Sequence, residues 1–222
     1  MSALDTVEAV VTALTTAPAE IPENGYILEG MPDEVLQVAY TVQDAIEISQ
    51  YFQLDMEAIQ AGRNKALEFH NKKRELHEGT NPMILNKHAN RRAQDWADKI
   101  AAGEEYGYDP ENRVCGENIV LINLQSDLDY MTLADFQHTG EDCVNRWYQQ
   151  IEDYDFENHT NLNNKKVGSF TQLIWKTSQI LGVGIALEKD GNYIVVVCRY
   201  FQEGNIVGQR AQQVGQLIES CS

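Results

Sequence analysis

Residues 168–176 read GSFTQLIWK, and residues 181–184 read LGVG. From there two strand-like runs extend over 181–187 and 193–201, and the dipeptide Asp190-Gly191 separates them. A turn dipeptide of this kind between two apolar runs is a strong signal for a β-hairpin. The end of the chain therefore predicts an antiparallel pair of strands that enters the core.

Upstream of this hairpin the apolar residues recur at helical spacing. One stripe predicts a buried helix and consists of Ala89, Ala93, Trp96, Ala97 and Ile100. A second helix is expected before the Glu78-Gly79 break, and a third from about Thr139, which forms a pattern like a capping box with Asp142. Several helices followed by a late hairpin favour the α+β class.

The charge of the chain is strongly negative and unevenly distributed. Its 222 residues include 34 acidic and 17 basic ones, a net charge of −17. Eleven of the acidic residues, and no Lys or Arg, fall within residues 1–60. Such a field repels phosphate backbones, so nucleic acid is not expected as a partner. The expected partner is a protein with a basic surface, or a large cytoplasmic assembly that offers one.

Two further observations bear on the location of the protein. No apolar run approaches the ~20 residues that a membrane-spanning helix needs. The N-terminus has no basic region of the kind that opens a secretory signal. We therefore expect a cytoplasmic protein with reduced cysteines.

Residues 1–60 are predicted to be a separate, partly helical acidic extension, and residues 61–222 the main domain. Apolar residues at helical spacing predict one helix over about 33–50 and another from near Leu54. The candidate partner-binding face of the first helix consists of Val35, Val38, Val42 and Ile46. Such a face needs a cover. The alternatives are its own domain, another protein, or a second copy of the chain in a homodimer.

Four motifs in register resemble the CAP superfamily of cysteine-rich secretory, antigen 5 and pathogenesis-related proteins. They are His70-Asn71 with the later run 93–97 (AQDWA), the run 115–119 (CGENI), the run 168–176 with LGVG, and the run 199–205 (RYFQEGN). The resemblance covers about residues 62–210. It implies a three-layer α-β-α sandwich, here with an extra N-terminal helical extension. Residues 145–148 (NRWY), with Ile151 and Tyr154, are similar to the intracellular, Golgi-associated branch of the family. This resemblance implies an association with Golgi, membrane or cytoskeletal structures.

Many members of this family carry two histidines and two glutamates in one open cleft, a donor set that suits zinc. Matched position by position, these residues fall in this chain at Tyr108, Glu117, Gln150 and Ser169. Only Glu117 retains the family residue. The resemblance therefore implies a degenerate cleft with no metal, no cofactor and no acid–base pair, in which Glu117 either remains a cleft carboxylate or ties a buried loop.

The remaining chemistry-bearing residues give no other site. No two of the five histidines are spaced to hold one ion on a helix; His70 is expected in the core and the others at the surface. The leading hypothesis is thus a non-enzymatic protein-binding or structural module. The alternatives are a peripheral membrane protein that binds lipid or sterol, as relatives of this family do, and a hydrolase that uses Glu117.

Overall fold

A computed structural model describes residues 42–124 and 131–218, with side chains from Met56 onward. The chain from Ala58 onward forms one compact unit. Its centre is a four-stranded sheet in the order β1-β5-β6-β2. The strands are β1 (Ile84–Leu85), β2 (Gly116–Asn123), β5 (Ile180–Leu187) and β6 (Tyr193–Phe201). β1 is parallel to β5, and the other pairs are antiparallel.

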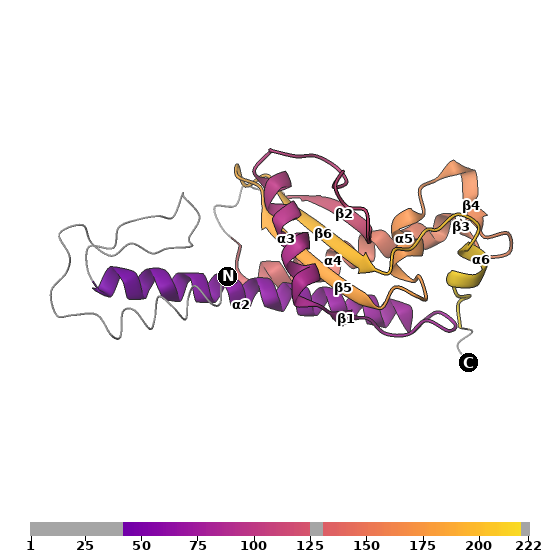
Figure 1. Cartoon of the computed structure of the whole chain (residues 1–222), viewed down its shortest axis with the longest axis horizontal. Coiled ribbons are helices and arrows are strands. Elements are labelled where there is room, and N and C mark those ends of the chain that lie inside the picture. Colours follow the sequence, from indigo (N-terminus) through magenta and orange to yellow (C-terminus); the bar gives the residue numbers. More distant parts are fainter. Residues whose placement is uncertain (1–41, 125–130, 219–222) are drawn as a thin grey trace. The chain divides into compact units, whose positions relative to one another are not determined.

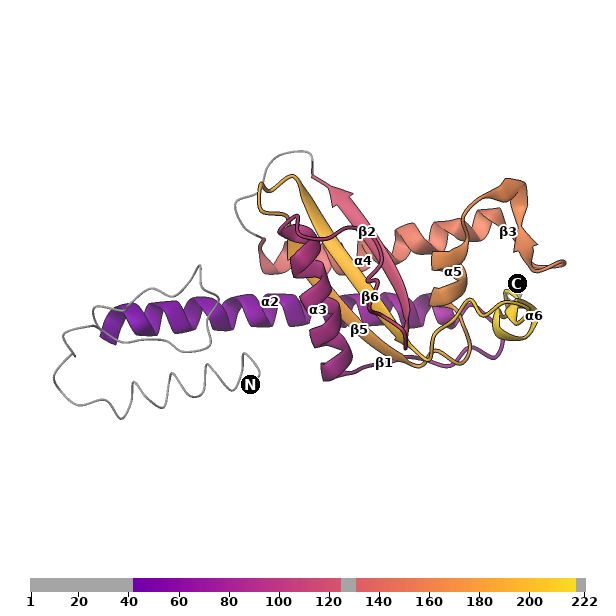
Figure 2. The ribbon, with the colours of Figure 1, turned by 45° about the horizontal axis from the view of Figure 1, so that its top comes forward.

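Helices cover both faces of this sheet (Figures 1 and 2). Helix α3 (Lys87–Ala101) packs on β5 and β6 from one side. On the other side lie α4 (Leu133–Tyr148), α5 (Gly168–Leu173) and the part of α2 (Val42–Arg74) from Ala58 onward. Two apolar clusters, one on each face, form the core. The α+β class and the three-layer sandwich are thus confirmed.

Short elements complete the unit between α4 and the C-terminus. They are η2 (Gln149–Asp153), β3 (Tyr154–Asp155), β4 (Thr160–Asn161), η3 (Leu162–Asn164) and α6 (Arg210–Gln213). Residues 214–218 then return to the end of α2, where the amide of Glu78 donates to Gln216 and the amide of Ile218 donates to Leu76.

Glycines set the close approach of the helices. A Cβ atom on Gly182 or Gly184 would lie 2.3 Å from the backbone of Ala89 or Ala93, so α3 rests directly on β5. On the other face, a Cβ atom on Gly140 would lie 2.3 Å from the carbonyl oxygen of Gly62. The glycines of the LGVG motif therefore allow helix–sheet contact and form no phosphate loop.

The hairpin and the helix around Trp96 occur where the sequence predicts them. Gly191 adopts a φ of +73°, which suits the turn between β5 and β6. The predicted start of α4 at Thr139 is wrong. The helix begins after Thr132, whose hydroxyl caps the Asp135 amide while the Asp135 carboxylate accepts from the Thr132 amide.

The structure describes only the last part, residues 42–60, of the predicted N-terminal extension. Residues 42–74 form one continuous helix, so the predicted interruption between residues 50 and 54 is wrong. The predicted boundary at 60/61 falls inside this helix. Of the candidate partner-binding face, Val35 and Val38 lie outside the described residues; Val42 and Ile46 belong to α2 in the part described by its backbone only.

Candidate functional site

The four positions of the predicted cleft come from four different elements. Glu117 is on β2, Gln150 is in η2, and Ser169 is in the first turn of α5. Tyr108 lies in the loop between α3 and β2, where its side chain is 67 % exposed. The structure brings Gln150 and Ser169 together, whereas the contacts of Glu117 are with the loop before β2 and with β6.

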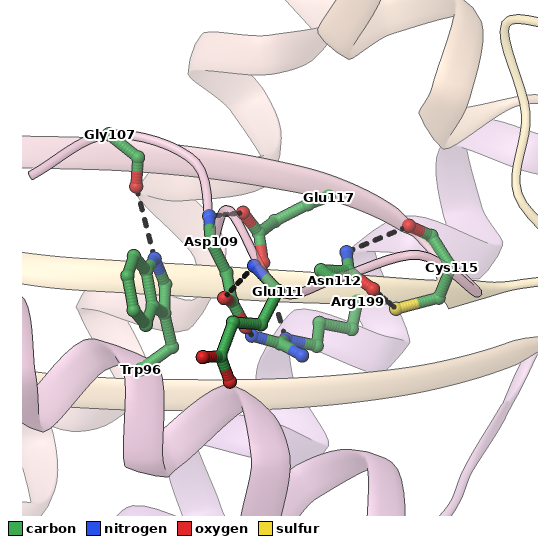
Figure 3. A network of polar contacts seen from close by, with 8 residues as sticks. All are labelled: Trp96, Gly107, Asp109, Glu111, Asn112, Cys115, Glu117 and Arg199. Atoms are coloured by element: carbon green, nitrogen blue, oxygen red, sulfur yellow. Dashed lines mark hydrogen bonds and ion pairs between the residues drawn. The ribbon is translucent and has the colours of Figure 1, made fainter.

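Glu117 is part of a buried ionic network on the α3 face of the sheet (Figure 3). It lies directly across from Arg199 on β6, and Oε2 of Glu117 is 3.2 Å from Nε of Arg199. Nη2 of Arg199 donates to Oδ2 of Asp109 at 2.5 Å, and the Asp109 amide donates to Oε1 of Glu117 at 3.0 Å. Arg199 thus holds two carboxylates, one from β2 and one from the loop.

The two carboxylates respond differently to this position. Burial raises the pKa of Glu117, despite its bond from the Asp109 amide and the charge of Arg199. Burial opposes the charge on Asp109 as well, but hydrogen bonds from Arg199 and the Glu111 amide outweigh it and lower the Asp109 pKa. The stronger partner of Arg199 is therefore Asp109, and Glu117 is held mainly as an acceptor for the loop.

Gln150 and Ser169 meet on the opposite side of the sheet. Oε1 of Gln150 accepts from the amides of Ser169 and Phe170, at 3.1 and 3.2 Å. These are free amides at the start of α5, which Gln150 caps from outside the helix. The Ser169 carbonyl accepts from Nδ2 of Asn118 at 3.0 Å. The Gln150 side chain therefore bonds to backbone amides, and Ser169 takes part through its own backbone amide and carbonyl.

Asn118 connects this corner to a buried chain of neutral hydrogen bonds. Its Nδ2 donates to the Tyr200 hydroxyl at 3.0 Å, and this hydroxyl lies 2.9 Å from Nε2 of His70. Nδ1 of His70 is 2.7 Å from the Ala66 carbonyl, which only accepts, so Nδ1 carries the proton and Nε2 accepts from Tyr200. Burial lowers the pKa of His70 to about 4. The predicted core position of His70 is confirmed.

His77 corrects the prediction that the other histidines are at the surface, since it is only 2 % exposed. Its Nδ1 donates to the Gly215 carbonyl at 2.9 Å, and its Nε2 accepts from the Tyr148 hydroxyl at 3.0 Å. Both partners are distant in sequence, so local spacing could not reveal them. His77 fixes the C-terminal segment to the end of α2.

The residues at the four cleft positions do not fit a zinc ion. Tyr108, Gln150 and Ser169 offer no imidazole and no carboxylate, and Glu117 is already bound to an amide and a guanidinium. Among the side chains that the structure describes, residues 56–124 and 131–218, no three or more His, Cys, Asp or Glu are placed to hold a metal. No chemistry is therefore assigned to a metal at this site.

Sequence reasoning missed Arg199 and Asp109. A signal was available for Arg199, since it is the one charged residue within the apolar run 193–201 and must therefore be buried with a partner. Asp109 is placed by a loop whose path only the structure shows. Cys115 is buried beside this loop; burial raises its pKa, and its Sγ donates to Oδ1 of Asn112.

Comparison with known proteins gives consistent results. The model of the cysteine-rich secretory protein family (CAP) matches residues 67–200. Human Golgi-associated plant pathogenesis-related protein 1 is 33 % identical over 148 residues, which are 66 % of this chain and 86 % of that protein. Allurin of Xenopus tropicalis is 30 % identical over 125 residues, 54 % of each chain.

Solved structures share the fold. The structure of BmVAL-1 gives a TM-score of 0.56 at 20 % identity and covers 72 % of this chain and 84 % of its own. That of NaASP2 with Zn2+ gives 0.53 at 23 % identity and covers 70 % and 87 %. Within the described part of this chain, none of the helices is both long and apolar enough to cross a bilayer.

Proposed function

We propose that this chain, which belongs to the cysteine-rich secretory protein (CAP) family, acts as a non-enzymatic protein-binding or structural module with a degenerate family cleft. The observation that carries the proposal is the environment of Glu117. This side chain is the last family carboxylate of the cleft; one of its oxygens accepts a hydrogen bond from the Asp109 amide, and the other forms an ion pair with Arg199 at 3.2 Å.

The same observation argues against a hydrolase that uses Glu117. A general base must face the proton that it removes. The Glu117 side chain is only 4 % exposed, and it faces the Arg199 side chain, which is 2 % exposed. A second carboxylate is near in Asp109, but the hydrogen bond from Arg199 holds it as a paired anion. Neither group is a free base.

The partner that we propose is a protein with a basic surface. The net charge of −17 favours such a partner through long-range attraction. We also propose a cytoplasmic location close to Golgi membranes, because the human relative is Golgi-associated by name and 33 % identical.

The test is affinity capture with the full chain from native extract at low and high salt, followed by cross-linking to locate the contact. We expect to recover a protein in nearly equal molar amount to this chain, with cross-links to the unit that starts at Ala58. Its recovery should be weaker at high salt. Glu117→Gln serves as the matched variant and should capture the same protein. Hydrolysis of a substrate by the wild type that Glu117→Gln abolishes would contradict the proposal.

A second candidate function, lipid binding at a membrane surface, rests on a separate patch. Leu162, Ile206 and Val207 are exposed, Val207 to 97 %. Arg210 joins the two loops that carry them, since its Nη1 donates to Oδ1 of Asn161 at 2.7 Å. Lys165 and Lys166 follow Leu162 in sequence. Apolar tips beside cations are typical of surfaces that touch anionic bilayers.

Vesicle flotation separates this candidate from the first. The full chain is mixed with phosphatidylcholine vesicles, with and without phosphatidylserine. Lipid binding predicts flotation with the anionic vesicles and its loss in Val207→Asp. The matched control is Val114→Asp, because Val114 is also exposed, to 57 %, but lies before β2. Equal flotation of both variants would remove the patch from consideration.

A further inference from the structure

We propose that the free edge of β2, together with the tyrosine-lined groove beside it, docks an extended basic and aliphatic segment of a partner protein, which adds to the sheet as a fifth strand. The inference rests on the proposed function as a protein-binding module and names the surface that would do the binding. It is carried by the backbone of β2, the side chains of the groove, and the charges around them.

The backbone of β2 has an open side. The strand ends the sheet and pairs with β6 through eight consecutive residues. Beyond its end the Leu124 amide donates to the Asn192 carbonyl. In an antiparallel pair these bonds alternate along the strand. The backbone amides and carbonyls of the even residues of β2 therefore point to β6, and those of Ile119, Leu121 and Asn123 point away from it. Within residues 42–124 and 131–218, no backbone group bonds to these outward amides and carbonyls.

The part of β2 after Asn118 carries no residue that protects this edge. Natural sheets usually block an exposed edge with lysine, proline or a bulge. Residues 119–123 read IVLIN and contain none of these, and the register with β6 is unbroken. An unprotected edge of this length is a template for another strand.

The side chains of Ile119, Leu121 and Asn123 line a groove on the α3 face of the sheet, next to this edge. Helix α3 covers β5 and β6, and β2 extends past it. The groove is lined by Ile100, Tyr106, Gly107, Tyr108, Ile119, Leu121, Asn123 and Tyr193. Tyr106 is 79 % exposed and Leu121 is 48 % exposed. A strand paired with β2 would place every second side chain over this apolar floor.

The charges around the groove define the occupant. Glu104 and Glu105 directly precede Tyr106, and Glu188 and Asp190 act on Tyr193, whose pKa is raised by burial and then by these carboxylates. Lys99 and Lys189 are the cations near in sequence, so acidic groups prevail. A basic segment suits this rim. A second copy of a chain with net charge −17 would bring two acidic rims together.

The experiment selects decapeptides from a displayed random library on the immobilised full chain. We expect the enriched peptides to be net positive with alternating aliphatic residues. Their synthetic forms should bind Leu121→Lys at least tenfold more weakly than the wild type. The control is Ile84→Lys, on the exposed β1 at the other edge of the sheet, which should bind as the wild type does. Two N-methylated forms of each peptide separate the two edges of the bound strand, one methylated at its odd residues and the other at its even residues. Only the form whose methyl groups replace the amide hydrogens that face β2 should lose binding.

Three outcomes would overturn the inference. They are failure to enrich any peptide, enrichment of neutral or acidic peptides, and equal binding to Leu121→Lys. Sedimentation of the wild type and Leu121→Lys adds a fourth, because a dimer that this substitution dissolves would make a second copy the occupant. The capture experiment distinguishes failure of this inference from failure of the proposed function. A protein partner that cross-links to a different surface would support the proposed function and contradict docking at β2.

Discussion

Glu117 and Asn118 are neighbours on β2, and Arg199 and Tyr200 are neighbours on β6, but the two members of each pair serve opposite faces of the sheet. On the α3 face, Glu117 and Arg199 form an ionic network with Asp109. On the other face, Asn118 and Tyr200 form a neutral chain with His70. The same two strands thus bury charge on one side and uncharged hydrogen bonds on the other.

The difference lies in how completely the polar groups are satisfied. In the neutral chain each donor meets an acceptor, from Asn118 through Tyr200 and His70 to the Ala66 carbonyl. In the ionic network, Oε2 of Glu117 and Nε of Arg199 are buried and 3.2 Å apart without hydrogen-bond geometry. The ionic face therefore depends on one cation, whereas the neutral face distributes its bonds over four groups.

The largest expected effect is that of removing this cation. Arg199→Leu leaves Glu117 and Asp109 as unpaired carboxylates, so the free energy of unfolding should fall by about 3–5 kcal/mol. Urea unfolding at pH 7 measures it. Adding Glu117→Gln should recover part of the loss. The matched control is Arg146→Leu, which breaks an exposed helical ion pair with Asp142. If both substitutions cost the same, the ionic face has no special dependence on Arg199.

The neutral face should instead be sensitive to acid. Because the folded pKa of His70 is about 4 and its ordinary value is 6.5, the unfolded chain takes up more protons as the pH falls. The contribution of neutral His70 is complete above pH 6.5 and is lost towards pH 4. At about 1.4 kcal/mol per pKa unit it amounts to about 3 kcal/mol. We expect the stability difference between wild type and His70→Gln to shrink by this amount between pH 7 and pH 4; a constant difference would contradict the assignment.

A smaller effect is expected when one link of the neutral chain is removed. Tyr200→Phe keeps the ring but removes the hydroxyl that donates to Nε2 of His70 and accepts from Nδ2 of Asn118. Since both groups are buried, unfolding should become easier by about 1–3 kcal/mol. Thermal and urea unfolding measure the change. Tyr108→Phe is the control, because its hydroxyl belongs to an exposed side chain and should matter little.

The smallest effect is expected for Glu117→Gln. Burial raises the pKa of Glu117, which means that the charged form costs more in the folded protein than in the unfolded chain. An amide at this position still accepts from the Asp109 amide, and Arg199 keeps its bond to Asp109. The free energy of unfolding at pH 7 should therefore stay the same or rise by up to about 1 kcal/mol. A clear loss of stability would show that the Glu117 charge itself supports the fold.

Local sequence signals were sufficient for the central elements. The two apolar runs that flank Asp190-Gly191 predict β5 and β6, and the helical stripe around Trp96 predicts α3 together with its buried side. They failed at α4 because Thr139 and Asp142 repeat the spacing of the true cap, Thr132 and Asp135. Thr139 is buried, beside the Gly140 contact with α2, a tertiary fact that helix capping rules do not contain.

The site was predicted less completely than the fold. Glu117 and its role in tying the loop were among the predicted alternatives, and the hydrogen bond from the Asp109 amide is the contact that this role requires. The placement of Asp109 and the direct pairing of Glu117 with Arg199 depend on strand register over more than eighty residues. Gln150 and His77 likewise act on backbone groups brought near by the chain's return. The spacing of residues along the sequence does not predict such tertiary contacts.

The direction of the hydrogen bonds at His70 has a consequence for solvent exchange. The Tyr200 hydroxyl proton is committed to Nε2 of His70, and both side chains are fully buried. Water cannot replace this proton until the sheet and α2 separate. The proton should therefore persist long enough to give its own magnetic resonance signal, and its exchange rate would time the opening of the core.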